Sequence, residues 1–387
     1  MKVAVVGDGG REQALRHVLG RTATLVDPSA DADLYVIGPE QPLVDGEADR
    51  LRADGKLVFG PGADGARLEG SKAWMKEVLV GAGVPTARHG TFTEVEPAIA
   101  FLRTLPGLYV VKTDGLAAGK GVFVTESLDE AADDVRAKLS GSSFGSAGRT
   151  VVIEEGLRGP ELSLLAVCDG RRAVPLAPAR DYKRVGDGDA GPNTGGMGAF
   201  SPVPDAGPAV VDEVMAKAVE PTLAALRAEG IDYRGVLYTG LMLTAEGPKV
   251  IEYNVRFGDP EAQVVLPRFA GDLARFLAEA AAGDLQSEAS FVEDACVCVV
   301  LAAEGYPASP RAGAEVSGIG EAETMEGVMV LKTGVRPDAG GRLVAAGGRV
   351  LNVVALGPTV AAARDRAYEA AARIHFDGMH YRKDIAS

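Results

Sequence analysis

The chain has 387 residues, 47% of them hydrophobic and 24% charged, which is enough for two or three domains with hydrophobic cores. Its formal net charge of −14 argues against nucleic acid or an anionic membrane as the main partner, because both bind basic surfaces. No run approaches the ~20 apolar residues of a membrane span, and the start MKVAVVGDGG turns polar too early for a signal peptide. We therefore expect a cytoplasmic protein whose three cysteines, Cys168, Cys296 and Cys298, are buried free thiols.

The first 70 residues alternate short apolar strands with helical patterns, which predicts a small parallel sheet with helices on its faces. Strands are expected at residues 2–6, 34–37 and 57–59, and helices at 11–19 and 49–53. The turns Gly7–Gly10 and Gly38–Glu40 follow two of these strands, at the edge where such sheets bind ligands.

The first of these turns has two interpretations. The sequence GDGGRE resembles the dinucleotide motif G-x-G-x-x-G, but Glu12 replaces its last glycine, so a dehydrogenase is only a minor alternative. The other interpretation is a small phosphate bound by the free N–H groups at the start of the helix. Candidate ligand contacts in this region are Gly9, Gly10, Arg11, Glu12, Pro39 and Glu40.

The central region begins with a predicted helix at residues 71–81, for which Ser71 is the expected cap. Further helices are expected at 94–104, 129–139 and 209–229, and strands at 150–155 and 161–167. Residues 235–244 and 250–253 are predicted to form a β-hairpin, whereas 181–202 shows almost no periodicity and is predicted to be a long loop.

The stretch VVKTDGLAAGKGVFV, residues 110–124, differs from a Walker phosphate-binding loop. Gly115 and Gly119 are one residue too close together, Gly121 stands where the motif has Ser or Thr, and a strand follows instead of a helix. We interpret it as a flexible turn between two strands. Lys112, at the end of an apolar strand, and Lys120, on a loop able to close, are candidate phosphate contacts.

Three further stretches carry candidate ligand groups. Glu252 and Asn254 alternate on a predicted strand, so both side chains project from one face and fit a hard cation completed by phosphates. Arg256 continues the alternation beside them. The strand end Glu154–Leu157 offers backbone groups to an adenine, and Glu161 offers a carboxylate to ribose hydroxyls.

The stretch GPNTGGMG, residues 191–198, has four glycines that permit close backbone approach to a ligand, although taken alone it also fits a disordered surface loop. The charged residues Asp181 and Lys183 precede it. From about residue 291 onwards, strands at 297–302, 328–333, 343–345 and 350–356 and a helix at 359–374 predict an antiparallel α+β lobe.

Taken together, these stretches resemble the ATP-grasp superfamily and, within it, the glycinamide ribonucleotide synthetase family. The resemblance is carried, in the family's order, by GDGGRE, GPEQPLVDG, LEGSKAWMK, KTDGLAAGKGV, VIEE, DYKRVGDGDAGPNTGGMGAFSP, VIEYNVRFGDPE and YRKDI. It implies an α/β and α+β multidomain fold. The expected domains are a parallel-sheet domain at 1–70, an ATP-grasp domain at 71–275 with a lid lobe at about 85–160, and an α+β domain at 288–387.

The resemblance also implies an activity. ATP would be used with Mg²⁺, or Mn²⁺, to convert glycine to glycyl phosphate, which 5-phosphoribosylamine then attacks in purine biosynthesis. We expect a monomer acting on these small molecules. The implied ATP contacts are Lys72, Lys112, Gly115, Gly119, Lys120, Gly121, Glu154, Glu155, Leu157 and Glu161, with the metal on Glu252 and Asn254. The implied substrate contacts are Gly9, Gly10, Arg11, Glu12, Pro39, Glu40, Asp181, Lys183, Asn193, Thr194, Gly195, Gly196, Met197, Gly198, Arg256 and Asp259, with Arg256 and Lys120 in catalytic roles.

The chain departs from the family pattern in its N-terminal region. Asp8 and Gln13 stand where the family usually has Asn and His, and Tyr182 stands where His is common. Between Thr22 and Tyr35 the family has a further strand and helix for which this chain is too short. A related ligase with a different amine or carboxylate is therefore an alternative, and a non-catalytic nucleotide sensor is another.

Overall fold

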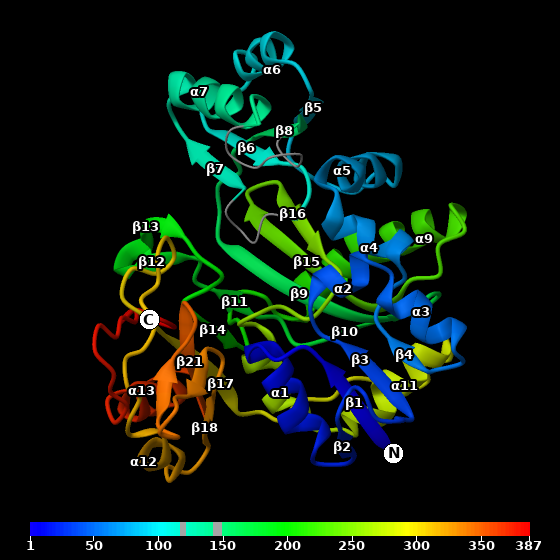
Figure 1. Cartoon of the computed structure of the whole chain (residues 1–387). Helices are drawn as coiled ribbons and strands as arrows, with labels where there is room; N and C mark the ends of the chain where they lie inside the picture. Colours follow the sequence, from blue (N-terminus) through cyan, green and yellow to red (C-terminus); the bar gives the residue numbers. More distant parts are fainter. Residues whose placement is uncertain (117–120, 142–148) are drawn as a thin grey trace.

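The computed structural model describes residues 1–116, 121–141 and 149–387. Figure 1 shows a lid at the top, a central sheet below it, the N-terminal domain at the lower right and the C-terminal domain at the lower left. The predicted arrangement of a parallel α/β domain, a middle region of two lobes and an antiparallel α+β lobe is confirmed.

The N-terminal domain is a parallel sheet in the order β2-β1-β3-β4. Its strands are β1 (Lys2–Val6), β2 (Thr24–Val26), β3 (Leu34–Ile37) and β4 (Val58–Phe59). Its helices are α1 (Gly10–Leu19), α2 (Glu40–Val44), α3 (Glu47–Ala53) and α4 (Ala63–Gly70). The expectation that a strand is missing after Thr22 is wrong, since β2 pairs with β1. The chain then passes from β2 to β3 without a helix.

The lid is an antiparallel sheet in the order β5-β8-β6-β7 with two helices. It comprises β5 (His89–Phe92), α6 (Val95–Leu102), β6 (Tyr109–Thr113), β7 (Val122–Thr125), α7 (Leu128–Leu139) and β8 (Val151–Glu155). Its apolar side chains form a core of their own, which includes Val111, Val135 and Ile153. The helix α5 (Lys72–Gly81) precedes the lid, and the Ser71 hydroxyl accepts the Trp74 N–H at 3.2 Å, as predicted for its cap.

The central sheet has the order β10-β9-β15-β16 and forms the floor beneath the lid. Its strands are β9 (Glu161–Asp169), β10 (Ala173–Pro175), β15 (Arg234–Thr244) and β16 (Gly247–Asn254), the last two forming the predicted hairpin. Its helices are α8 (Pro208–Val214) and α9 (Glu220–Ala228), joined by a π-helical turn, followed by α10 (Ala262–Val265) and α11 (Leu273–Ala282).

The predicted long loop at 181–202 is wrong in part, because the segment contains short strands. These are β11 (Arg180–Asp181), β12 (Arg184–Gly186), β13 (Ala190–Asn193) and β14 (Gly198–Ser201). They are too short to show a periodic sequence pattern. Their structure depends on pairing: β11 pairs with β14, β14 with β17, and β12 with β13. The interpretation as a disordered surface loop is therefore not supported.

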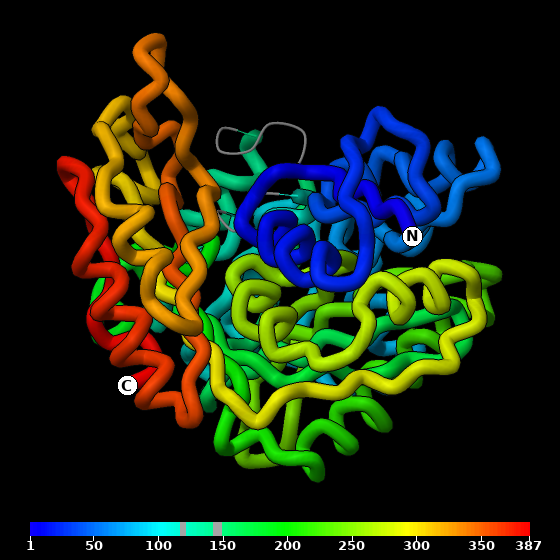
Figure 2. Tube along the Cα trace, turned by 90° about the horizontal axis from the view of Figure 1, so that it is seen from below, coloured from blue at the N-terminus to red at the C-terminus, as the bar shows by residue number. Residues whose placement is uncertain are grey.

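The C-terminal domain extends β11 and β14 into a sheet of order β11-β14-β17-β21-β18, whereas β12 and β13 pair with each other in a separate two-stranded sheet. Its own elements are β17 (Ala295–Ala302), α12 (Ile319–Glu323), β18 (Val328–Leu331), β19 (Val335–Pro337), β20 (Leu343–Ala345), β21 (Arg349–Gly357) and α13 (Val360–Ala371). Figure 2 shows the segment after α11, in yellow, crossing the underside of the molecule to reach this domain. The sheet therefore joins residues on both sides of the predicted boundary near 288.

Two apolar clusters run through the parts of the molecule below the lid. One of them contains Val3 of the N-terminal domain, Phe257 after β16 and Val354 of β21. Cys168, Cys296 and Cys298 are buried free thiols, as predicted, and burial raises the pKa of each. Among the described residues, no helix has the length and apolar character needed to span a membrane.

Candidate active site

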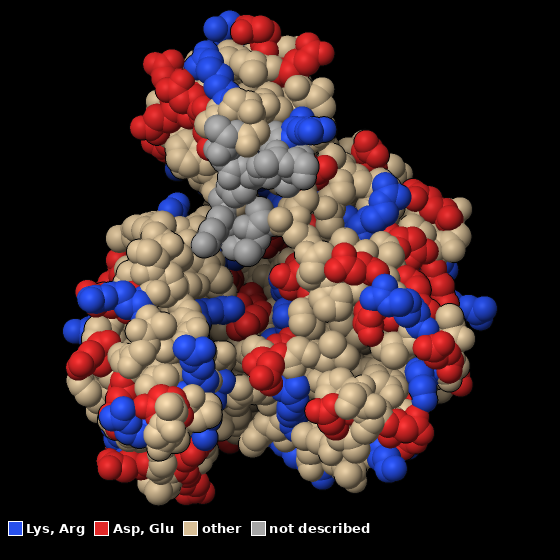
Figure 3. Space-filling model, viewed as in Figure 1, with Lys and Arg blue, Asp and Glu red and all other residues tan. Residues whose placement is uncertain are grey.

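A cavity of about 820 Å³ lies between the lid, the central sheet and the two terminal domains. Figure 3 shows a groove between the two lower halves of the molecule, with charged side chains of both signs on its walls. The structure brings these predicted residues to the cavity wall: Arg11, Glu40, Lys72, Lys112, Gly121, Glu154, Glu155, Leu157, Glu161, Asp181, Lys183, Asn193, Thr194, Gly195, Glu252, Asn254, Arg256 and Asp259.

Other predicted residues do not line the cavity. They are Gly9, Gly10, Glu12, Pro39, Gly115, Gly196, Met197 and Gly198. Gly115 and Gly196 have positive φ, Gly10 begins α1, Gly198 begins β14, and Met197 is fully buried. Gly119 and Lys120, which carried the prediction of a closing phosphate loop, lie outside the described residues.

Lys72 and Lys112 both line the cavity and belong to different elements, α5 and β6. The Lys72 ammonium, at the start of α5, donates to the Gly115 carbonyl at 2.8 Å. Burial lowers its pKa, and the nearby Glu252 carboxylate opposes that shift. Lys112, on β6, donates to the Ile251 carbonyl at 3.0 Å, which ties the lid to the strand that carries Glu252. The two cations thus face the same space from separate elements.

Lys112 also belongs to a buried charge cluster that the sequence analysis missed. The Glu154 carboxylate lies 2.8 Å from the Lys112 ammonium and 2.9 Å from the Lys76 ammonium. Burial raises the pKa of Glu154, but the two ammonium groups outweigh it and leave the pKa below its ordinary value. Burial likewise lowers the pKa of Lys76 to about 8. Lys76 lies on α5 one turn after Lys72, and the sequence gives no sign of its partner 78 residues away.

Glu252 and Asn254 project from one face of β16, as their alternation predicted, and both line the cavity. Burial raises the pKa of Glu252, but Lys183, Lys112 and Lys72 together hold it below its ordinary value, so the carboxylate is ionised. One carboxylate and one amide oxygen fit Mg²⁺, which typically takes one or two carboxylates plus phosphate oxygens. No cluster of three or more His, Cys, Asp or Glu side chains suited to a metal occurs in the described ranges, so the pair needs a phosphate ligand to complete a site.

Arg256 is fixed by two carboxylates from the N-terminal part of the chain. Its guanidinium donates to Glu69 at 2.9 Å and to Glu40 at 3.3 Å, and it reaches the Asn254 amide oxygen at 3.4 Å. Glu69 also accepts the Val255 N–H at 2.8 Å, which holds the end of β16 in place. The motif LEGSK contains Glu69, yet nothing in the sequence showed that its carboxylate reaches Arg256.

On the opposite wall, Glu161 and Lys183 form an ion pair, and Asp181 lies 3.6 Å from the same ammonium. Burial raises the pKa of Asp181 to about 7. Burial alone lowers the pKa of Lys183, but Asp181 and Glu161 hold it well above its ordinary value. Glu161 was predicted as a ribose contact and Lys183 as a substrate contact, so the structure brings the two predicted subsites together.

The start of α1 is arranged differently from the prediction for Glu12. Its carboxylate is buried, accepts the Gly9 N–H at 2.7 Å and receives the Arg11 Nε at 2.6 Å. Glu12 therefore caps the helix, and its predicted contact with a ligand stays a prediction. Arg11 donates to the Phe257 carbonyl at 3.1 Å. Arg11 and Glu40 both line the cavity and are contributed by the N-terminal domain.

Gly196 is required by its backbone and its neighbour. Its φ is +105°, and a Cβ there would lie 2.4 Å from Pro260 Cδ. We expect Gly196→Ala to lower the free energy of unfolding by about 1–3 kcal/mol and to lower turnover by displacing Gly195. Gly230→Ala, also at positive φ but with open space around it, is the matched control. Thermal unfolding measures the change in stability of each variant, and initial rates measure the change in turnover. Equal rates for Gly196→Ala and Gly230→Ala would contradict the predicted role of Gly196 in holding Gly195 in place.

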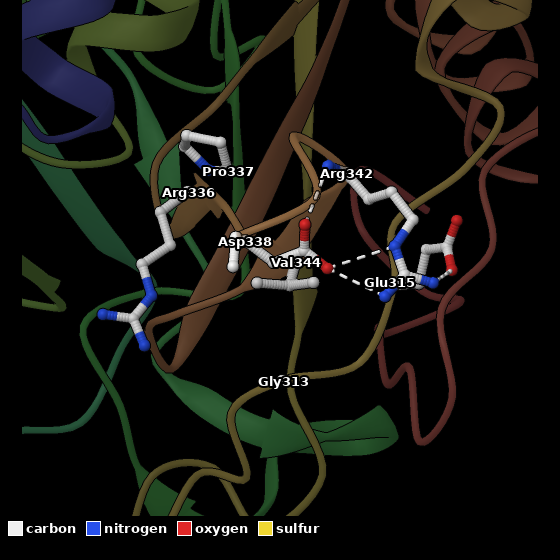
Figure 4. Close-up of a pocket in the computed structure, with 8 residues that line it drawn as sticks. Gly313, Glu315, Arg336, Pro337, Asp338, Arg342 and Val344 are labelled. Atoms are coloured by element: carbon white, nitrogen blue, oxygen red, sulfur yellow. Dashed lines mark hydrogen bonds and ion pairs between the residues drawn. The ribbon is translucent and has the colours of Figure 1, made fainter.

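A second, more open pocket of about 560 Å³ lies in the C-terminal domain, away from these residues (Figure 4). Its Arg342 guanidinium donates to Asp338 at 2.8 Å and to Glu315 at 3.0 Å. Its lining includes a second cation, Arg336, but none of the ligand contacts predicted from the sequence.

Comparison with known proteins agrees with this geometry. Residues 22–69, 70–262 and 296–387 match the N, ATP-grasp (A) and C domains of phosphoribosylglycinamide synthetase. A phosphoribosylamine–glycine ligase from Streptomyces coelicolor is 45% identical over 422 aligned positions, covering 100% of this chain and 99% of the relative. The alignment is longer than the 387-residue chain, so part of that relative has no counterpart here.

Solved structures are similar as well. A phosphoribosylamine–glycine ligase from Thermotoga maritima superposes with a TM-score of 0.87 at 34% identity, with 100% of both chains covered. The biotin carboxylase domain of a Hydrogenobacter thermophilus 2-oxoglutarate carboxylase, solved with MgADP, has a TM-score of 0.72 at 16% identity, which shows a shared fold. Given matches to all three domain models and this identity over its full length, the chain belongs to the phosphoribosylglycinamide synthetase family.

Proposed function

We infer that the chain is an ATP-dependent ligase that joins glycine to 5-phosphoribosylamine, forming glycinamide ribonucleotide, ADP and phosphate. The observation that carries this is the cavity itself. It gathers Lys72, Lys112 and the Glu252/Asn254 pair beside the glycine-rich loop, residues 191–197. The chain that forms this cavity is 45% identical to two relatives named phosphoribosylamine–glycine ligase. The intact carboxylate–amide pair argues against a non-catalytic sensor.

In the first step, a glycine carboxylate oxygen attacks the γ-phosphorus of ATP, and the bond to the β-phosphate oxygen breaks as ADP leaves. This reaction needs alignment and charge neutralisation more than a protein nucleophile. Lys112 is buried and Lys72 is partly buried, and both line the cavity, where we propose that they hold the phosphates. We propose that the edge Glu154–Leu157, which also lines the cavity, receives the adenine. A divalent cation on Glu252 and Asn254, which we propose is Mg²⁺ and which Mn²⁺ can replace, would neutralise phosphate charge.

In the second step, the amine of phosphoribosylamine attacks the carbonyl carbon of glycyl phosphate. The C–N bond forms, the C–O bond to phosphate breaks, the electron pair leaves with inorganic phosphate, and the nitrogen releases a proton. Arg11 and Glu40 of the N-terminal domain and Asp181, Asn193, Gly195, Arg256 and Asp259 are the proposed substrate contacts at this end of the cavity.

The shortened N-terminal domain keeps the parts that face the cavity. The β1–α1 unit positions Arg11, and the turn after β3 positions Glu40, whereas the helix that is absent would follow β2. A related ligase with another amine is therefore not favoured. We also propose that the enzyme acts as a monomer on small molecules.

An amine panel tests this function. Purified enzyme with glycine, MgATP and freshly prepared phosphoribosylamine is expected to release one ADP per glycinamide ribonucleotide formed. Ribosylamine without the phosphate, or ammonia, is expected to give much slower turnover. The assignment would be overturned if phosphoribosylamine gave no ADP above background while another amine supported rapid turnover.

A further inference from the structure

The C-terminal domain contacts the glycine-rich loop, residues 191–197, which borders the cavity. The strand β14, which directly follows this loop, pairs with β17, so that Gly198 lies opposite Val299. One residue earlier, the Met197 carbonyl accepts the Val300 N–H at 3.0 Å. The exit of the loop is thus part of the C-terminal sheet (Figure 1).

Two C-terminal side chains hold the peptide groups of Gly195 within the loop. The Gly195 N–H donates to the Tyr306 hydroxyl at 2.9 Å, and the Gly195 carbonyl accepts from Arg349 Nη1 at 2.6 Å. A Cβ on Gly195 would lie 3.1 Å from the guanidinium carbon and 3.3 Å from the hydroxyl. The contact is therefore close enough that a side chain on Gly195 would push it apart.

Arg349 connects this loop to a second cavity segment. Its Nη1 donates to the Asp259 carbonyl at 3.0 Å, and its Nη2 donates to the Asp259 carboxylate at 3.0 Å. Gly195, Asp259 and Arg349 all line the cavity. One guanidinium, planar and with several fixed donors, thus sets the distance between two proposed substrate contacts.

Tyr306 and Arg349 form one packed unit. A Cβ on Gly348, the residue before Arg349, would lie 2.4 Å from Tyr306 Cδ2, so the tyrosine ring rests directly on that backbone. A third residue, Arg382, supports the loop from further away. Its side chain is 1% exposed and donates to Asp189 at 2.7 Å and to the Arg184 carbonyl at 3.2 Å. The same domain therefore contacts Arg184 and Asp189 before the loop, Gly195 within it and Met197 at its end.

We propose that Arg349 and Tyr306 are positioning residues for the ligation, through which the C-terminal domain fixes the Gly195 peptide and Asp259 at the substrate end of the cavity. This proposal rests on the proposed function. Lys72 and Lys112, the cations assigned to the phosphates, make no hydrogen bond or ion pair to either residue. Loss of the hydrogen bonds from Arg349 and Tyr306 to Gly195 and Asp259 should therefore impair ligation far more than nucleotide binding.

The test compares Arg349→Met, Arg349→Lys and Tyr306→Phe with two controls. Arg336→Met removes an exposed arginine of the same domain, and Tyr35→Phe removes a hydroxyl that donates to the Ala30 carbonyl at 2.8 Å in the N-terminal domain. We measure kcat and KM for glycine and phosphoribosylamine, the dissociation constant of MgADP, and thermal unfolding.

Arg349→Met is expected to lower kcat/KM for phosphoribosylamine by about 100-fold, and Tyr306→Phe by about 10-fold, because small displacements of reacting groups are costly. MgADP affinity should stay within about 3-fold of wild type. Arg349→Lys should restore part of the rate, since a lysine keeps the positive charge but has one donor nitrogen in place of the planar guanidinium. Both controls should match wild type.

Three outcomes would overturn the proposal: a rate for Arg349→Met within about 2-fold of wild type, a parallel loss of MgADP affinity, or a rate loss matched by both controls. If Arg349→Met does not fold, Tyr306→Phe decides alone, because it removes a single oxygen, and an unchanged rate then counts against the proposal. Absence of turnover in the wild type would instead refute the proposed function, so the two failures are distinguishable.

Discussion

Glu252→Gln is expected to lower turnover by about 1000-fold while the fold persists, because the variant loses the negative charge that anchors a cation against the phosphates. Glutamine keeps the size and one oxygen of the side chain, so packing on β16 should change little. The side chain carries its charge because Lys183, Lys112 and Lys72 hold the pKa of Glu252 below its ordinary value despite burial.

Glu246→Gln is the matched control, since Glu246 is an exposed carboxylate at the turn of the same hairpin. Besides initial rates, the decisive readout is MgADP binding by calorimetry over a range of Mg²⁺ concentrations. Added Mg²⁺ should strengthen ADP binding to wild type and to Glu246→Gln, but much less to Glu252→Gln. An unchanged rate and an unchanged Mg²⁺ dependence in Glu252→Gln would refute the metal assignment.

The second large effect is expected from Lys112→Met. Lys112 and Lys76 both pair with Glu154, but only Lys112 lines the cavity. Losing a charge-assisted contact to a phosphate costs about 1.5–3 kcal/mol, so Lys112→Met should weaken ATP binding by about 10- to 100-fold. Lys76→Met should leave ATP affinity within about 3-fold of wild type, because Lys76 pairs with Glu154 but does not line the cavity.

Both lysine variants are expected to lower the free energy of unfolding, because each leaves Glu154 with one cation in place of two in a buried site. Thermal unfolding measures this shared loss, and calorimetry with ATP measures the difference between the variants. Equal losses of ATP affinity in Lys112→Met and Lys76→Met would show that the cluster acts only on stability, and that Lys112 is not a phosphate contact.

Local patterns in the sequence predicted those parts of the site that depend on neighbouring residues. The alternation of Glu252 and Asn254 placed both on one face of β16, and the apolar run before Lys112 placed that lysine at a strand end. The Ser71 cap and the β15–β16 hairpin are confirmed for the same reason, since their hydrogen bonds join residues close in sequence.

Contacts between distant residues could not be predicted in this way. Glu69 reaches Arg256 across 187 positions, and Arg349 reaches Gly195 across 154. A single glutamate on a helix or a single arginine before a strand has the sequence pattern of a solvated surface residue. Their partners can be identified only in the folded structure, where residues of the N-terminal and C-terminal domains lie beside those of the central region.

The segment 181–202 illustrates the same limit for secondary structure. Its strands have between two and four residues, below the length at which alternation is informative. The glycine motif within it was predicted to allow close backbone approach to a ligand, and this stays a prediction. The structure shows close approach to the protein itself, since Gly196 lies against Pro260 and Gly195 lies against Arg349. Pairing of β11 and β14 with the C-terminal sheet, which sequence composition does not reveal, fixes the two ends of the segment.

Oxygen transfer from glycine to phosphate tests the central claim most directly. Glycine labelled with ¹⁸O in its carboxylate is incubated with the enzyme, MgATP and phosphoribosylamine, and the released phosphate is examined by mass spectrometry. If a carboxylate oxygen attacks the γ-phosphorus in this cavity, each phosphate will carry one ¹⁸O from glycine. Phosphate that contains only unlabelled oxygen, in a reaction that does form the amide, would contradict the acyl-phosphate route and the roles assigned to the cavity.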